Sequence, residues 1–210
     1  MSGLFITFEG GEGAGKSTQI RLLKETLEKM GKSVLLTREP GGSDGGEKIR
    51  PLLVSGNADW DALTEVLLFS AARRDHLIQK IWPALKEGKI VLCDRFADST
   101  MAYQGYGRKD DKELQQKLTQ LYKMIAGDFE PDLTFILDID PVIGLKRSCD
   151  RFGNMERRFE DMDIVFHQNL RQAFLQIASK NPKRYHVISA EQSIEDIHQK
   201  IMKVINQYVR

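Results

Sequence analysis

The stretch from Gly10 to Ser17 reads GGEGAGKS and fits the pattern GxxxxGK followed by Ser or Thr. It follows a short β-rich apolar run, Leu4 to Phe8, and precedes Ser17 to Met30, whose apolar residues have helical spacing. A strand, this loop and a helix in that order form the phosphate-binding unit of P-loop proteins. A glycine-rich turn with a chance Lys-Ser pair is the alternative, and the flanking strand and helix argue against it.

The residues of this loop have distinct expected roles. Backbone N–H groups of the turn and the N-terminus of the following helix favour phosphate. Lys16 is expected to reach the β- and γ-phosphates of a nucleoside triphosphate, and Ser17 to bind Mg²⁺. The loop says little about the group that accepts the phosphate. The predicted nucleotide-binding residues here are Gly10, Gly11, Glu12, Gly13, Ala14, Gly15, Lys16, Ser17 and Thr18.

The rest of the chain alternates between short apolar runs and helical patterns. Strands separated by helices predict a P-loop α/β fold with a five-stranded, mainly parallel sheet covered on both faces. The 210 residues carry no linker and suit a single domain over 1–210. The further strands are expected at Ser33 to Thr37, Ile90 to Cys93, Leu133 to Leu137 and Tyr185 to Ile188, and the helices at Leu63 to Leu85, Glu113 to Ile125, Ile164 to Ala178 and Ile194 to Val209.

Composition argues against several other classes of protein. The net charge of +1 gives no reason to expect a nucleic-acid partner. No apolar run is long enough to cross a membrane, and the N-terminal run is too short for a signal peptide. Cys93 and Cys149 form no CxxC pair, which favours a reducing, cytoplasmic setting. The chain also lacks the NKxD motif of guanine-nucleotide switches and the LSGGQ motif of transport ATPases.

Charged residues follow the second and third expected strands. Arg38 and Glu39 follow one strand, and Asp94 and Arg95 end the other. Ligands bind beyond the carboxyl ends of such strands, so a carboxylate and a guanidinium there suit a Mg²⁺ and phosphate clamp. Taken alone, Asp94 and Arg95 could equally form a structural ion pair. The same loop continues with the polar sequence ADSTMAYQG, which no apolar face explains.

Four segments resemble the thymidylate kinase family, in its order and at similar intervals: TFEGGEGAGKST, TREPGG, LCDRFADSTMAYQG and a stretch ending in ERRFE. The third is the most family-specific, and the resemblance extends from about Leu4 to Glu160. It implies transfer of the γ-phosphoryl group of ATP to dTMP with Mg²⁺, giving dTDP and ADP on the route to dTTP. It also implies a homodimer, to which Val66, Leu67 and Leu68 could contribute unless they belong to the core. The alternative is another nucleoside monophosphate or nucleoside kinase.

The resemblance also implies roles for individual residues around the acceptor. Phe69 would stack on thymine and Arg73 would bond its O4, although Phe69 could also be a core residue of its helix. Tyr103 would lie beside C2′ of the sugar. Thr100 and Gln104 would lie near the base and its N3–H, and Arg38, Arg50 and Arg95 around the acceptor phosphate, with Glu39 supporting them. The substrate-binding candidates are Arg38, Glu39, Arg50, Phe69, Arg73, Arg95, Ser99, Thr100, Tyr103 and Gln104, and the metal candidates are Ser17 and Asp94.

An Arg-dense segment, about 147–160, resembles the lid that closes over ATP in this family, or could be a solvated charged loop. Glu12 is acidic and cannot stabilise negative charge on the γ-phosphate, so a lid arginine is expected to do so. Arg158 is the first choice, Arg151 the second because it could stack on adenine, and Arg147 the third. Gln192, after the last strand, resembles an adenine-side residue. The catalytic candidates are Lys16, Arg95, Arg158, Glu12 and Asp94.

Overall fold

The computed structural model of this protein describes residues 3–55, 59–107, 111–149, 158–159 and 161–209. Five strands form one sheet in the order β2-β3-β1-β4-β5, and every neighbouring pair is parallel. The prediction of a five-stranded parallel sheet is therefore confirmed. The strands are β1 (Leu4–Glu9), β2 (Val34–Arg38), β3 (Ile90–Asp94), β4 (Leu133–Asp138) and β5 (Tyr185–Ser189).

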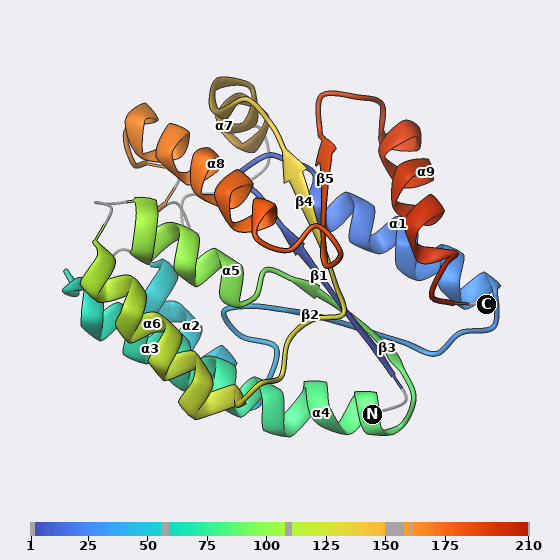
Figure 1. Ribbon diagram of the computed structural model, residues 1–210, viewed down its shortest axis with the longest axis horizontal. Coiled ribbons are helices and arrows are strands. Elements are labelled where there is room, and N and C mark those ends of the chain that lie inside the picture. Colours follow the sequence, from blue (N-terminus) through green and yellow to red (C-terminus); the bar gives the residue numbers. More distant parts are fainter. Residues whose placement is uncertain (1–2, 56–58, 108–110, 150–157, 160, 210) are drawn as a thin grey trace.

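Helices cover both faces of the sheet (Figure 1). On one face, α1 (Lys16–Lys29) and α9 (Ile194–Ile205) pack against Ile6 and Phe8 of β1. Phe5 of the same strand points to the opposite face, because side chains alternate along a strand. The helical elements packed on that second face are η1 (Leu77–Ile81), α4 (Trp82–Lys86), α6 (Lys112–Ala126) and α8 (Ile164–Ser179).

The helix expected from Leu63 to Leu85 is three consecutive elements in the structure. α3 (Ala62–His76) passes into the π-helical η1, which passes into α4. Arg95, at the end of β3, is followed by two elements that the sequence did not predict. These are α5 (Ala97–Thr100) and the π-helical η2 (Met101–Gly107), which together present the polar ADSTMAYQG segment to the centre of the molecule.

Two further helices lie outside the helical ranges given above. α2 (Asp44–Val54) begins after Ser43, whose Oγ accepts a hydrogen bond from the N–H of Gly46. Glycine and Pro51 within α2 lower its helix propensity, so packing against α3 stabilises it more than local preference does. α7 (Pro141–Cys149) takes up the first residues of the expected lid. Across the described residues, no helix combines the length and the apolar character needed to cross a bilayer.

Candidate active site

A cavity of about 910 Å³ opens at the carboxyl ends of β1, β2 and β3. It brings the phosphate loop, the segment after β2, helix α3 and the α5–η2 segment around one space. This arrangement is the one that the parallel sheet predicts for a ligand site. The predicted residues that line it are Glu12, Gly13, Ala14, Gly15, Lys16, Ser17, Arg38, Glu39, Arg50, Phe69, Arg73, Asp94, Arg95, Ser99, Thr100, Tyr103 and Gln104.

The phosphate loop is held in place by its own lysine and by close backbone packing. Lys16 Nζ donates to the carbonyl oxygens of Gly10, at 3.1 Å, and Gly11, at 2.9 Å. Burial lowers the pKa of Lys16, and the charge of Arg95 lowers it further. Gly13 has φ +66°, and a Cβ there would lie 1.9 Å from the carbonyl oxygen of Gly144 in α7. Only glycine therefore allows the loop to approach α7 this closely.

Two oxygen-bearing side chains meet beside the loop. Ser17 Oγ, in the first turn of α1, donates to Asp94 Oδ2 at the end of β3, at 2.8 Å. A hydroxyl and a carboxylate are oxygen donors of the kind that Mg²⁺ prefers. Within the described residues, no group of three or more His, Cys, Asp or Glu side chains could hold a metal ion. The pair has the type of oxygen donor that would fit a Mg²⁺ ion bound together with nucleotide phosphates.

Glu12, Arg95 and Tyr103 form a compact cluster beside the phosphate loop. Glu12 Oε1 accepts from Arg95 Nη2 and from the Tyr103 hydroxyl, both at 2.7 Å. The Arg95 guanidinium also lies 5.1 Å from the centre of the Tyr103 ring. Burial acts to raise the pKa of Glu12, but the charges of Arg95 and Lys16 and the Tyr103 hydroxyl outweigh it and hold that pKa at about 2. Glu12 is thus an anchor for Arg95 and Tyr103.

Arg95 occupies an unusual backbone conformation. Its φ is +66°, in the left-handed region, and it is the only described residue other than glycine with a positive φ. Such a conformation costs of order 1 kcal/mol. It is held by the Arg95 N–H bond to Phe8 O, at 2.9 Å. The turned side chain donates through Nη1 to Gly10 O, at 3.1 Å, and to Ser99 Oγ, at 3.2 Å. The strained turn aims the guanidinium into the space beside the phosphate loop.

Arg73 and Thr100 lie on the opposite wall, near Phe69. Arg73 Nη2 donates to Thr100 Oγ1 at 2.8 Å, and Arg73 Nε donates to Glu39 Oε2 at 2.7 Å. Arg73 is 4% exposed and Glu39 is 6% exposed, so this is a desolvated ion pair. Glu39 Oε1 also meets His76 Nδ1 at 3.0 Å. Glu39 was expected to hold the arginines around the acceptor phosphate. Its described partners are Arg73 and His76, so that role stays a prediction.

The two other arginines expected around the acceptor phosphate lie at the mouth of the cavity. Arg38 Nη2 is 3.2 Å from Glu47 Oε2 in α2, and both side chains are substantially exposed. Arg50 Nη1 donates to Pro40 O at 2.6 Å. Both side chains line the cavity and are long enough to reach an anion within it.

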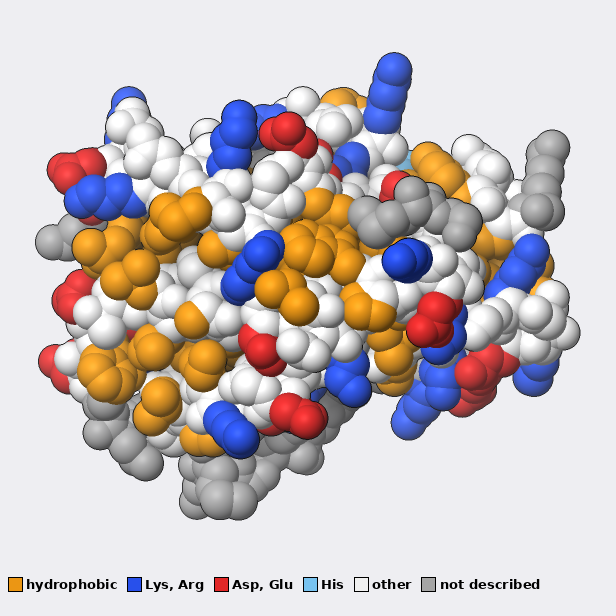
Figure 2. Space-filling view, turned by 90° about the horizontal axis from the view of Figure 1, so that it is seen from below, with side chains coloured by type: hydrophobic (Ala, Val, Ile, Leu, Met, Phe, Trp, Pro, Cys, Tyr) orange, Lys and Arg blue, Asp and Glu red, His pale blue; other side chains and the backbone are white. Residues whose placement is uncertain are grey.

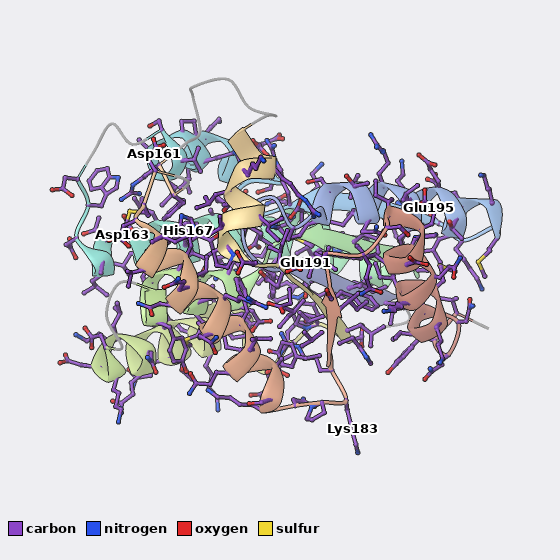
Figure 3. The ribbon with its side chains drawn as sticks, turned by 90° about the horizontal axis from the view of Figure 1, so that it is seen from above. Asp161, Asp163, His167, Lys183, Glu191 and Glu195 are labelled. Atoms are coloured by element: carbon purple, nitrogen blue, oxygen red, sulfur yellow. The ribbon has the colours of Figure 1, made fainter. Side chains whose placement is uncertain are left out.

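Ser148 and Phe159 of the expected lid segment line this cavity, whereas the lid arginines Arg147 and Arg158 and the adenine-side candidate Gln192 are not among its described lining residues. Arg158 forms an ion pair with Glu65 of α3 and donates to Leu53 O at 3.0 Å. Arg147 donates to Ala190 O at 2.9 Å, and Arg151 lies outside the described residues. Gln192 donates to Ser189 O at 2.9 Å. Figure 3 labels its neighbour Glu191 in the loop between β5 and α9, with Glu195 in the first turn of α9.

Sequence reasoning missed two fully buried carboxylates next to the cavity. Glu9, the last residue of β1, accepts from the Phe96 N–H at 2.8 Å and from Ser99 Oγ at 2.5 Å. Burial, and then the charge of Asp98, raise the pKa of Glu9. Because Glu9 ends β1, and ligands bind at the carboxyl ends of parallel strands, its position in the sequence could have identified it as a residue near the site. Glu65 precedes Phe69 by four residues, the spacing of one helix face, which also points it toward the site.

Comparison with known proteins gives a consistent result. The family model described as thymidylate kinase matches residues 8–201. A thymidylate kinase of Magnetococcus marinus is 54% identical over 93% of this chain and 91% of its own length. One from Ruegeria pomeroyi is 48% identical over 97% of this chain and 95% of its own length. A crystal structure of thymidylate kinase from Ehrlichia chaffeensis has a TM-score of 0.78 and 39% identity, covering 98% of this chain and 99% of that one.

Proposed function

The chain belongs to the thymidylate kinase family and phosphorylates dTMP with ATP as donor, and we propose that both reacting groups meet in the cavity described above. One observation carries the proposal. The same cavity has the phosphate loop with Lys16 on one side and a buried aromatic and guanidinium pair, Phe69 and Arg73, on the other. In a nucleoside monophosphate, the base would suit the side with Phe69 and Arg73, and the phosphate would suit the side with the phosphate loop. The product dTDP is an intermediate on the route to dTTP.

The chemistry needs alignment and charge stabilisation, with no covalent help from a side chain. An oxygen of the dTMP phosphate attacks the γ-phosphorus of ATP, an O–P bond forms, and the bond to the β–γ bridging oxygen breaks, which releases ADP. Lys16 would hold the β- and γ-phosphates, and Arg95 would hold the acceptor phosphate near them. Ser17 and Asp94 would hold Mg²⁺, which when bound neutralises phosphate charge. Tyr103, beside C2′, would crowd a 2′-hydroxyl.

A parallel assay of acceptors tests this assignment. The rate of ADP release should be measured with dTMP, dUMP, dCMP, dGMP, AMP and thymidine, at equal concentrations. We expect kcat/KM for dTMP to exceed that for dCMP by at least about tenfold, because a buried donor that faces the 4-amino group of cytosine loses its partner. Comparable kcat/KM values for dTMP and dCMP would contradict the proposed base pocket, and activity confined to thymidine would point to a nucleoside kinase.

We also propose a homodimer that forms through the outer face of α3. Val66 is fully buried and belongs to the core, whereas Leu67, the next residue, is 49% exposed. Leu63, one helical turn earlier, is also exposed, and Ile78 of η1 continues the exposed apolar row. Seen from below, hydrophobic side chains gather on the face of the molecule to which α3, α4 and α6 contribute (Figure 2). An exposed apolar surface of this kind is typical of an interface between subunits.

The variant Leu67→Asp tests the dimer. A charge at this position would have to be buried at the interface, so we expect the variant to sediment as a monomer where the parent chain sediments as a dimer. Ile194→Asp on α9 is the matched control, because Ile194 is also 49% exposed but lies on the far side of the sheet. A parent chain that sediments as a monomer at micromolar concentration would exclude the proposed interface. We further propose a cytoplasmic location, which the free, buried thiol of Cys93 fits.

A further inference from the structure

Gln104 has a buried side chain on the wall of the acceptor cavity, and only one end of its amide has a partner. Its side chain is 1% exposed. The amide Nε2 donates to Glu65 Oε2 at 3.4 Å, whereas Oε1 is buried without a hydrogen-bond partner among the described residues. A buried carbonyl oxygen without a partner costs about 1–3 kcal/mol. Such an atom on a cavity wall indicates a donor on the ligand.

Glu65 determines which end of that amide faces the ligand. Its side chain is 0% exposed, and it does not belong to the described lining of the cavity. The guanidinium of Arg158, which is always charged, donates to its Oε1. A carboxylate has only acceptor oxygens, so the amide of Gln104 must turn its NH₂ group toward Glu65. The Oε1 of Gln104 is then the end that remains for a ligand.

We propose that Glu65 is a specificity-determining positioning residue, which fixes Gln104 so that its Oε1 accepts a hydrogen bond from the N3–H of a 4-oxopyrimidine. The proposal rests on the function proposed above, in which the base lies against Phe69 and Arg73. Arg73 then offers a donor to O4 and Gln104 offers an acceptor to N3–H, which matches thymine and uracil. Cytosine has a donor at position 4 and an acceptor at N3, so it would be opposed at both positions.

Helix geometry explains why a residue outside the cavity can act in this way. Glu65, Phe69 and Arg73 follow one another at intervals of four residues and lie on one buried face of α3. The same face therefore carries the aromatic surface for the base, the donor for O4 and the carboxylate that orients Gln104 from η2. If Glu65 served only as the partner of Arg158, replacing it would change stability and lid contacts and would leave base preference unaltered.

The first test is the isosteric variant Glu65→Gln. The new amide can accept from Gln104 or donate to it, so Gln104 becomes free to turn its NH₂ group toward the base. We expect the ratio of kcat/KM for dTMP to that for dCMP to fall by about tenfold or more. Glu9→Gln is the control, because it also replaces a fully buried carboxyl group next to the cavity by an amide, and the described partners of Glu9 are Phe96 and Ser99 and do not include Gln104. Its ratio is expected to stay within about twofold of the parent's.

The second test uses the pH dependence of an acceptor whose N3–H ionises more readily. Fluorine at C5 withdraws electrons, so 5-fluoro-dUMP loses its N3 proton at lower pH than dTMP does. With the parent enzyme, kcat/KM for 5-fluoro-dUMP should fall as its N3 ionises, relative to dTMP at the same pH, because Oε1 of Gln104 then faces an anion. With Glu65→Gln this relative fall should flatten, because a turned amide can donate to the anion.

Each outcome supports or overturns the proposal. A folded Glu65→Gln variant with the parent's dTMP-to-dCMP ratio would overturn it. If that variant does not fold, the parent enzyme still provides a test. A parent enzyme whose kcat/KM for 5-fluoro-dUMP, relative to dTMP, does not fall as N3 ionises would also overturn the proposal. A parent enzyme that does not phosphorylate dTMP would instead refute the proposed function. The two failures are therefore distinguishable.

Discussion

Replacing Lys16 by alanine is expected to lower kcat about a thousandfold while the protein stays folded. Lys16 is the positively charged side chain of the phosphate loop, and in the structure it donates to the carbonyl oxygens of Gly10 and Gly11. Without its ammonium group, the charge that develops on the β- and γ-phosphate oxygens loses a preorganised partner. Removing one such donor from an active site typically costs about 10²–10³-fold in kcat.

The measurement is kcat for ADP release at saturating dTMP and ATP, with thermal unfolding recorded on the same preparation. Lys24→Ala is the control, because Lys24 lies on the same helix but is exposed and pairs only loosely with Glu28, at 3.6 Å. That variant should keep kcat within about twofold of the parent, since a surface ion pair contributes ~1 kcal/mol or less to stability. A folded Lys16→Ala variant with near-normal turnover would refute the assigned role of the loop.

Arg158→Ala is expected to lower kcat at least about a hundredfold while KM for dTMP changes little, as for an arginine that acts on the transferring phosphoryl group. Glu12 cannot supply positive charge there, and the Arg-dense segment that the sequence predicts as a lid, about 147–160, could do so. In the structure, Arg158 pairs with Glu65 of α3 and donates to Leu53 O of α2. Its action on ATP would therefore require the Nη1 end of the guanidinium to leave Leu53 O when the nucleotide binds, while Nη2 keeps its pair with the buried Glu65 carboxylate.

Steady-state kinetics distinguish this role from a purely structural one. If Arg158 only anchors α3, Arg158→Ala should raise KM for dTMP and leave kcat within about threefold of the parent, which is less than ~1 kcal/mol in the barrier. That result would contradict the prediction for Arg158. Arg147→Ala provides the comparison within the same segment. Arg147 lies near the end of α7 and donates to Ala190 O, so this substitution should lower kcat less than Arg158→Ala does.

The parts of this molecule that the sequence predicted are those with short-range patterns. The phosphate loop has fixed spacing, and each of the five strands is a short, mainly apolar run, so the sequence predicted the sheet and the edge at which the cavity opens. Helix α2 was missed because its glycines and Pro51 hide it from propensity, and contact with α3 stabilises it. The π-helical η1 and η2 have no recognised sequence pattern of their own.

The pairing of buried charges could not be predicted from the sequence. The described partners of Glu39 are Arg73 and His76, which lie far along the chain on α3, and no pattern near Glu39 points to either of them. Glu65 and Gln104 are likewise brought together only when α3 packs beside η2. Such contacts depend on how helices pack over a completed sheet, and residue spacing within one segment carries no information about that packing.

The order of strands in the sheet also determines how much of this chain can fold while it is being synthesised. The phosphate loop follows β1 and leaves the ribosome early, but β1 pairs with β3 and β4, where Leu4 meets Ile90 and Ile6 meets Leu133. Until those later segments emerge, the central strand has two unpaired edges and an apolar surface, a combination that favours aggregation. Nascent chains that end before β4 are therefore expected to need chaperones, and nucleotide binding should arise only near the completion of synthesis.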